Sequence, residues 1–311
     1  MGNLIAVKEG KGPSVMLAAH MDESLMVRYI DENGFLRFVG IGGGWFDQTL
    51  LNQRVIVHGK KGSIYGVIGS KPPHVMKDED RKKPVKLEDM FIDIGGAKDR
   101  EDAENLGVEI GTSVSIDQEF TTLANGKVTS KAFDNRAGVV ILVRVMKELH
   151  ERGIEANVYA VGTVQEEVGL KGAKTCTFCI CPDVALALDT TIPPGDHPGI
   201  SKTDSALELG KGPVITVADA SGRGLIAHPQ ILKWLRETAD KNEVPPYQLG
   251  VGSGGTTDAT SIHLTKEGIP TGTVSIATRY IHSPVEVLDM ADIDACVSLI
   301  VTAIENLKSY F

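Results

Sequence analysis

VMLAAHMDE, residues 15–23, is the stretch that decides the fold. Its five apolar residues, Val15 to Ala19, predict a strand that is buried on both faces, as in a sheet covered by helices. His20, Asp22 and Glu23 follow this strand. Polar side chains placed just after a buried strand lie at the sheet edge where α/β proteins keep their sites. We therefore expect an α/β fold with a functional site at the end of this strand.

Strands and helices alternate along the second half of the chain. Apolar runs predict strands over residues 157–164, 184–188 and 271–276. Periodic patterns predict helices over residues 137–150, 229–241, 257–267 and 290–308. Asp134 or Asn135 is the expected cap of the first of these helices. This alternation predicts a largely parallel or mixed sheet in a three-layer arrangement.

Residues 24–124 interrupt this pattern with a mostly β segment. Short β-type runs cover residues 25–30, 35–39, 54–57 and 63–68. Turns such as Asp31-Glu32-Asn33-Gly34 separate these runs, and the Pro- and Lys-rich residues 71–86 are expected to form a surface loop. We expect two domains, the first made of residues 1–23 and 125–311 and the second of the inserted residues 24–124.

The composition is that of a soluble globular protein, with 42% hydrophobic and 23% charged residues in a chain of 311. The formal charge of −9 argues against a nucleic-acid partner, since binding to phosphates needs clustered Lys and Arg. No apolar run is long enough to span a bilayer, so we expect no membrane partner. The first residues lack the charged-then-apolar pattern of a secretory signal, which indicates a cytoplasmic protein.

Three of the four cysteines lie close together as Cys176-x-x-Cys179-x-Cys181. This spacing suggests a metal or redox site. A closed zinc site, however, needs a fourth ligand and a paired spacing that this segment does not have. We favour buried free thiols on the edge of a strand or helix, in a reducing compartment.

Carboxylates and imidazoles gather at the predicted ends of strands and helices. The residues concerned are His20, Asp134, Glu166, Glu167, Asp189 and His282. Mixed nitrogen and oxygen donors of this kind suit divalent transition metals. Five ligands, one of them shared, are enough for a pair of ions that hold a water between them.

Each of these residues also has a plainer interpretation. A single His after a strand is more often a core residue than a ligand, adjacent glutamates are usually solvated, and Asp134 alone suits a helix cap. Glu166 and Glu167, however, end an apolar strand and run into Val168-Gly169-Leu170. Burying carboxylates without a partner costs several kcal/mol, so a bound metal is the more economical explanation. The pattern alone predicts a metal site and no more.

Five motifs occur in an order that resembles a known family. They are His20-Met21-Asp22-Glu23, Ala132-Phe133-Asp134-Asn135-Arg136-Ala137-Gly138, Gln165-Glu166-Glu167-Val168-Gly169, Ala187-Leu188-Asp189 and Tyr280-Ile281-His282-Ser283-Pro284-Val285-Glu286. Together they closely resemble the TET-type, or tetrahedral, dinuclear metallo-aminopeptidases, which include glutamyl aminopeptidases and proteins once labelled cellulase-like. The resemblance covers essentially the whole chain, although these proteins normally carry a helical segment before the strand that starts here.

The resemblance implies a fold, an assembly and a set of metal ligands. The implied fold is a three-layer zinc-peptidase-like catalytic domain with a small, mostly β, PDZ-like insertion. The insertion would serve for dimerisation, and the dimers would form a homo-oligomer as large as a hollow tetrahedral dodecamer. Two divalent ions, zinc or cobalt, are implied in each subunit. Their implied ligands are His20, Asp134, Glu167, Asp189 and His282.

The resemblance also implies catalytic roles. Asp134 would bridge the two metals, while His20 and Glu167 would bind different metals, in either order. Glu166 would act as the general base, and Asp22 would orient the His20 ring through its other nitrogen. The expected reaction is the removal of N-terminal residues from short peptides by a water activated between the metals. The preferred N-terminal residue is not predicted.

Three other functions stay open on the sequence. A dinuclear metallo-deacylase or amidase would use the same site and would accept substrates with a blocked amino group. A glycosidase, as in the old cellulase label, would need two carboxylates at a set separation and no obligatory metal. A structural protein with a vestigial site is disfavoured, because every candidate ligand and the base are present.

Overall fold

The computed structural model describes residues 1–42, 47–191, 195–241, 246–252 and 254–311. The chain divides into two compact units. The larger unit comprises Met1–Asp22, Thr121–Ile281 and Glu286–Phe311, and the smaller comprises Glu23–Phe120 and His282–Val285. Among the described residues, no helix combines the length and the apolar character that crossing a membrane requires.

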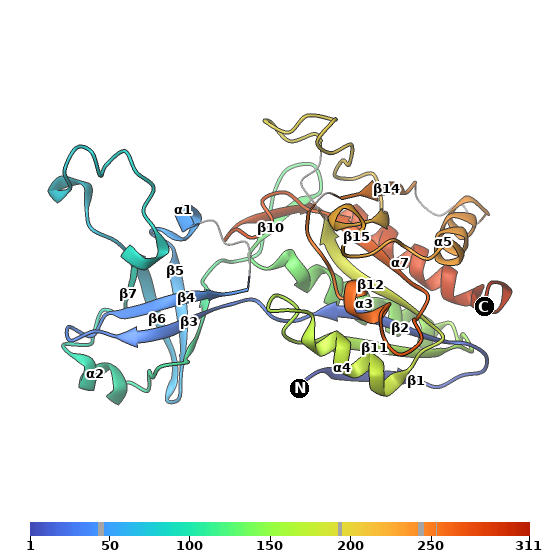
Figure 1. Cartoon of the computed structure of the whole chain (residues 1–311), viewed down its shortest axis with the longest axis horizontal. Coiled ribbons are helices and arrows are strands. Elements are labelled where there is room, and N and C mark those ends of the chain that lie inside the picture. The colour runs from blue at the N-terminus through green and yellow to red at the C-terminus, as the bar shows by residue number, and fades with distance from the viewer. Residues whose placement is uncertain (43–46, 192–194, 242–245, 253) are drawn as a thin grey trace. The chain divides into compact units, whose positions relative to one another are not determined.

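The larger unit is built on a seven-stranded sheet with the strand order β1-β11-β2-β12-β15-β13-β14 (Figure 1). Its strands are β1 (Leu4–Lys8), β2 (Ser14–His20), β11 (Asn157–Thr163), β12 (Val184–Thr191), β13 (Val214–Ala218), β14 (Gln248–Val251) and β15 (Thr271–Ala277). Strands β11, β2, β12 and β15 run parallel, whereas β1 and β13 pair antiparallel with their inner neighbours. The sheet is mixed, which confirms the predicted α/β class.

Helices cover both faces of this sheet and give three layers. The main hydrophobic core lies on the face covered by α3 (Phe133–Glu151), α5 (Pro229–Lys241) and α7 (Met290–Glu305). A second core lies on the face covered by α4 (Lys171–Ile180) and α6 (Ala259–Ile262). Alternate residues of β2 enter opposite cores, Leu17 the first and Met16 the second. Residues 15–19 are all apolar for this reason.

A smaller sheet and two 3-10 turns complete the larger unit. The sheet contains β9 (Thr121–Thr122), β10 (Lys127–Ser130) and β16 (Glu286–Asp289), with β10 in the centre. The turns are η3 (Ala220–Gly222) and η4 (Leu307–Ser309). Strand β16 leads directly into α7, and Asp289 caps this helix by accepting the N–H of Ala291.

The smaller unit is a closed barrel with the strand order β3-β4-β7-β6-β5-β8. Its strands are β3 (Ser24–Ile30), β4 (Leu36–Ile41), β5 (Arg54–Gly59), β6 (Gly62–Gly69), β7 (Phe91–Asp93) and β8 (Ser113–Ile116). Its short helical segments are α1 (Asp47–Leu50), α2 (Arg100–Asn105), η1 (Pro73–Val75) and η2 (Leu87–Asp89). Val55 and Val57 of β5 both pack into the barrel core, as the period of a half-buried strand requires. The predicted mostly β character is confirmed.

The helix predicted over residues 257–267 is much shorter in the structure. It covers only Ala259–Ile262, because the N–H of Thr265 donates to the carbonyl of Ile262 and closes a turn. Lys266 follows with a φ of 54°, which a helix cannot accommodate. The apolar pattern was correct, but local turns end the helix early.

The predicted strand over residues 184–188 is longer in the structure. Strand β12 extends to Thr191, so Asp189 lies inside a strand and not after its end. The extension comes from pairing with β15, where Asp189 is in register with Ser275. A partner strand supplies the hydrogen bonds that a polar residue alone does not predict.

The start of α3 distinguishes between the two predicted caps. Oδ1 of Asn135 accepts the N–H of Gly138 at 3.1 Å, which is a capping hydrogen bond. Asp134 and Asn135 both have non-helical backbone angles, so the regular helix begins after them. Asn135 therefore makes the capping bond to Gly138.

The four cysteines are free thiols, but they are not all buried. Cys176 and Cys296 are buried, whereas Cys179 and Cys181 are exposed. The prediction of buried thiols is wrong for these two. The physical reason is that Cys179 lies on the outer side of α4, while Cys181 ends that helix in a left-handed conformation with a φ of 50°.

Candidate active site

The candidate site lies at the carboxyl ends of three neighbouring parallel strands. Thr163 at the end of β11 is in register with His20 at the end of β2. On the other side of β2, Ala187 of β12 is in register with Ala18, so Asp189 reaches the same edge as His20. Parallel strands thus bring these side chains together from distant parts of the chain.

His20 is the centre of the cluster and is only 2% exposed. Its Nε2 lies 3.1 Å from Oδ1 of Asp134 and 3.8 Å from Oδ1 of Asp189. The same nitrogen lies 4.0 Å from Oε2 of Glu166. One imidazole is therefore faced by three carboxylates.

Two hydrogen bonds at the start of α3 hold Asp134 in place. The N–H of Asp134 donates to Oε2 of Glu286 at 2.8 Å. The neighbouring Asn135 donates its Nδ2 to the carbonyl of Leu188 at 2.7 Å. The second bond ties the beginning of the helix to β12, immediately before Asp189. Helix and strand are fixed together where their carboxylates converge on His20.

Asp22 connects the end of β2 with the turn that carries the paired glutamates. Its Oδ1 and Oδ2 accept the N–H groups of Glu166 and Glu167 at 3.1 and 3.3 Å. Its main-chain carbonyl lies 3.2 Å from Nδ1 of His20, whereas its carboxylate is 3.8 Å from that nitrogen. Asp22 therefore contacts His20 mainly through its backbone and holds the glutamates through its side chain.

The close approach of several carboxylates to the His20 imidazole shifts the pKa values in the cluster. Burial, followed by the nearby charge of Asp189, raises the pKa of Glu166 to about 9. Burial also raises the pKa of Asp189 well above its usual range. Burial alone would lower the pKa of His20, but its hydrogen bond to Asp134 and the surrounding carboxylates raise that pKa well above the usual value. Burial and crowding therefore favour the protonated forms of these groups in the metal-free protein.

This donor set fits a divalent metal. Ligand atoms of His20, Asp134 and Glu167 all lie within 4.8 Å of one another. Imidazole nitrogen and carboxylate oxygen are donors that zinc and cobalt accept. A cation would also replace the protons that the buried carboxylates otherwise need.

The remaining predicted ligand, His282, belongs to segment His282–Val285, which groups with the smaller unit. Its backbone has a φ of 59°, an uncommon value for a residue with a side chain. Its role as a metal ligand stays a prediction.

Two residues beside the cluster were not predicted from the sequence. Glu286 accepts the N–H of Asp134, although its place in the fifth motif suggested no role. Asp258 is only 2% exposed, and burial raises its pKa to about 6. The sequence placed it inside the helix predicted over residues 257–267, where no pattern indicated its burial.

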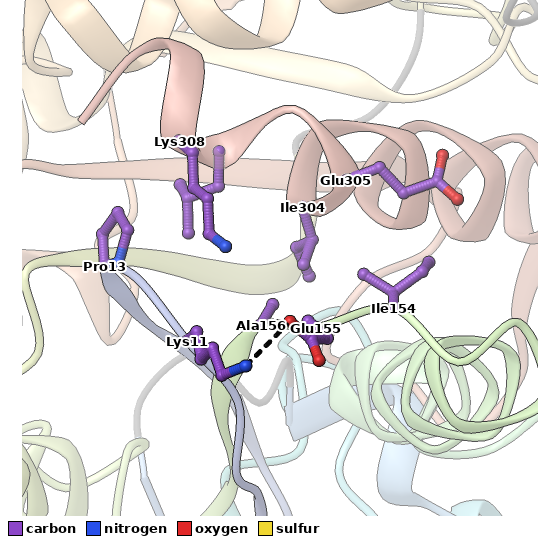
Figure 2. A pocket seen from close by; sticks show the side chains of 9 residues that line it. Lys11, Pro13, Ile154, Glu155, Ala156, Ile304, Glu305 and Lys308 are labelled. Atoms are coloured by element: carbon purple, nitrogen blue, oxygen red, sulfur yellow. Dashed lines mark ion pairs between the residues drawn. The ribbon is translucent and has the colours of Figure 1, made fainter.

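The cavity in Figure 2 lies at the amino ends of β2 and β11, whereas the candidate site lies at their carboxyl ends. It has a volume of about 260 Å³ and is lined by segments before β2 and β11 and by the end of α7. Lys11 and Glu155 form an ion pair of 3.9 Å beside it. None of the predicted site residues lines this cavity.

Known proteins resemble this chain in sequence and in fold. The model of the M42 glutamyl aminopeptidase family matches residues 2–299. The chain belongs to this family. A lysyl aminopeptidase from Pyrococcus furiosus is 37% identical over 316 residues, which cover 99% of this chain and 86% of that protein.

Solved structures of known peptidases resemble the chain along nearly its whole length. An aminopeptidase from Desulfurococcus kamchatkensis is 46% identical with a TM-score of 0.90, covering 98% of this chain and 83% of that chain. The TET1 peptidase of Pyrococcus horikoshii is 34% identical with a TM-score of 0.87, covering 97% and 87%. That peptidase is described as assembling into a tetrahedron or a large octahedral shell.

Membership of the M42 family confirms the resemblance seen in the sequence and the enzyme class. The protein is a metallo-aminopeptidase, and therefore a hydrolase. The family match favours this activity over the deacylase, the glycosidase and the vestigial site. Divalent metals are implied by membership of this family, and the group formed by His20, Asp134 and Glu167 is a possible site for one.

Proposed function

We propose that this M42 aminopeptidase hydrolyses the first peptide bond of short peptides with two divalent ions, zinc or cobalt, bound in each subunit. The convergence of His20, Asp134 and Glu167 within 4.8 Å carries this proposal. The proposed ligands are His20, Asp134, Glu167, Asp189 and His282. As the resemblance to this family implies, Asp134 would be the ligand shared by the two ions; of the three carboxylates that face the His20 ring, it also lies nearest to Nε2.

Glu166 is the proposed general base. When bound, the metals polarise the scissile carbonyl and lower the pKa of the attacking water. Glu166 accepts a proton from this water as its oxygen bonds to the carbonyl carbon, and then delivers the proton to the leaving amine as the C–N bond breaks. Its neighbour Glu167 is a ligand, so one turn supplies both functions.

Asp22 is the proposed orienting residue for both sides of the site. Its carboxylate accepts the N–H groups of Glu166 and Glu167, and its carbonyl lies next to Nδ1 of His20. A hydrogen bond from Nδ1–H to that carbonyl leaves Nε2 as the lone-pair nitrogen that a metal requires. Asp22 thereby sets the tautomer of the histidine and the position of the base.

The smaller unit is the proposed dimerisation domain, corresponding to the inserted residues 24–124 and of PDZ-like type. The larger unit is the proposed catalytic domain, which the sequence predicts over residues 1–23 and 125–311. We expect a homo-oligomer in the cytoplasm, built from dimers that assemble into a tetrahedral dodecamer. The relative that assembles into a tetrahedron supports this expectation. Light scattering on the purified protein measures the mass.

A panel of aminoacyl-anilides, with and without an acetylated amino group, tests the proposed activity. We expect hydrolysis of free-amine substrates with zinc or cobalt, loss of activity on chelation, and recovery when metal is returned. Elemental analysis should give two ions per subunit. Comparable hydrolysis of the acetylated substrates would favour a deacylase instead. The panel also identifies the preferred N-terminal residue, which the names lysyl and glutamyl leave open.

A further inference from the structure

The carboxylate of Asp258 is buried next to the catalytic cluster, but it does not cap the helix that follows it. Asp258 immediately precedes α6 and makes no side-chain capping hydrogen bond. An aspartate in this position normally accepts an N–H from the first helical turn, which stabilises the helix. Asp258 is only 2% exposed, so its carboxylate has neither this capping bond nor contact with bulk water. Its burial therefore needs another explanation.

Thr163 is the hydrogen-bond partner that holds Asp258. Its Oγ1 donates to Oδ2 of Asp258 at 2.5 Å, and Thr163 itself is completely buried. Thr163 is the last residue of β11, in register with His20, and its carbonyl accepts the N–H of Met21 at 2.9 Å. Thr163 thus links Asp258 to the point where β2 and β11 deliver their site residues.

The second carboxylate oxygen of Asp258 lowers the stability of the fold, so stability does not explain why this residue is buried. Oδ1 is buried and has no hydrogen-bond partner among the described residues. A buried carboxylate with a single hydroxyl partner costs free energy relative to an apolar side chain of similar size. Its negative charge also acts on Glu166 and on Asp189. A costly charge beside reacting groups indicates a functional role.

We propose that Asp258 is a positioning residue of the catalytic centre, acting through Thr163. The Thr163 hydroxyl fixes the end of β11, and the chain then turns over residues 164–165 to present Glu166 and Glu167. With Asp258 in place, this turn starts from a fixed point, and Asp22 holds its other end by the two N–H groups. The inference rests on the proposed roles of Glu166 and Glu167.

Thr163→Val, compared with Thr163→Ser, tests this role. Valine has nearly the same volume as threonine but lacks the hydroxyl, whereas serine keeps it. We expect Thr163→Val to lower kcat and zinc affinity by about 10-fold or more with KM nearly unchanged, since loss of an outer partner costs about 10–100-fold. Thr163→Ser should stay within about threefold of the wild type in both quantities, since it keeps the donor. Zinc affinity is measured by competition with a chromophoric chelator, independently of turnover.

Asp258→Asn provides a second test if Thr163→Val does not fold. It weakens the same hydrogen bond, because the acceptor loses its charge, and we expect kcat and zinc affinity to fall in the same direction. Asp292→Asn is the matched control: this buried aspartate accepts the N–H groups of Gly210 and Gly212, and its replacement should affect stability without lowering kcat.

The positioning role is wrong if Thr163→Val and Asp258→Asn keep the kcat and zinc affinity of the wild type. It is also wrong if Thr163→Ser loses as much as Thr163→Val, since the hydroxyl would then not matter. A wild-type protein that binds zinc but hydrolyses no free-amine peptide substrate would instead contradict the proposed function.

Discussion

At the scale of single residues, the chemistry depends on a group of buried carboxylates that share a single imidazole, that of His20. His20 faces the carboxylates of Asp134, Asp189 and Glu166 within 4.0 Å. A fold that buries so much negative charge is stable only when protons or metal ions neutralise it. The same crowding raises the pKa of Glu166 in the metal-free protein, and bound cations would favour the deprotonated form that a general base needs.

Glu166→Gln separates the base from the ligands. Glutamine cannot accept the proton of the attacking water, so we expect kcat to fall by about 10²–10⁴-fold while metal content stays at the wild-type level. Elemental analysis and turnover on the same preparation measure both quantities. Glu155→Gln, at an exposed glutamate paired with Lys11, is the control and should keep full activity. Near-normal turnover of Glu166→Gln would remove Glu166 from this role.

At the scale of elements, the sequence predicted best where burial on both faces left a continuous apolar run. Strands β2 and β11 were placed within one or two residues, and so were the acids that follow them. Contacts distant in sequence decided the rest. Pairing with β15 extends β12 past Asp189, and the bond from Asn135 to Leu188 holds the residue that caps α3. The local pattern of apolar and polar residues does not reveal either contact.

The candidate site was predicted through its motifs more than through its physics. Each residue alone suits a plainer role, and only the ordered set indicated a metal centre. Asp258 was missed because the sequence placed it inside the helix predicted over residues 257–267, where nothing marked it as buried. Its bond to Thr163 joins residues that are 95 positions apart, so no local pattern predicts it.

Gly138→Ala tests whether the start of α3 is tightly packed against β12. A Cβ at this position would lie 2.3 Å from Oδ1 of Asn135 and 2.7 Å from the carbonyl of Leu188. Alanine normally stabilises a helix relative to glycine, but here we expect a loss of about 1–3 kcal/mol because neither neighbour can move without breaking a bond.

Thermal unfolding of the metal-free protein measures this loss. The control is Val143→Ala on the same helix, at a side chain that is 59% exposed, where we expect a change within about 0.5 kcal/mol. A Gly138→Ala protein that is as stable as the wild type or more so would show that the start of α3 can relax away from β12.

At the scale of the whole molecule, the candidate site lies at the carboxyl ends of the parallel strands, and the cavity lies at their amino ends. His20, Asp189 and the glutamate turn lie at the carboxyl ends of the parallel strands. The cavity near Lys11 and Glu155 lies where the same strands begin (Figure 2). The start of α3 and the ends of the strands bring their carboxylates into one cluster. The ionisation of this cluster should therefore affect how tightly the protein binds metal.

Metal affinity should therefore rise with pH. The pKa of Glu166 is about 9 in the metal-free protein, so its carboxyl group holds a proton at neutral pH, and burial raises the pKa of Asp189 in the same direction. A cation favours the deprotonated form and must release bound protons, so each proton released should strengthen binding by about 10-fold per pH unit below the pKa. Chelator competition from about pH 6 to about pH 8, corrected for protonation of the chelator, measures this slope. Glu166→Gln carries no such proton, so its slope should be lower by about one proton; equal slopes would show that Glu166 is already ionised before metal binds.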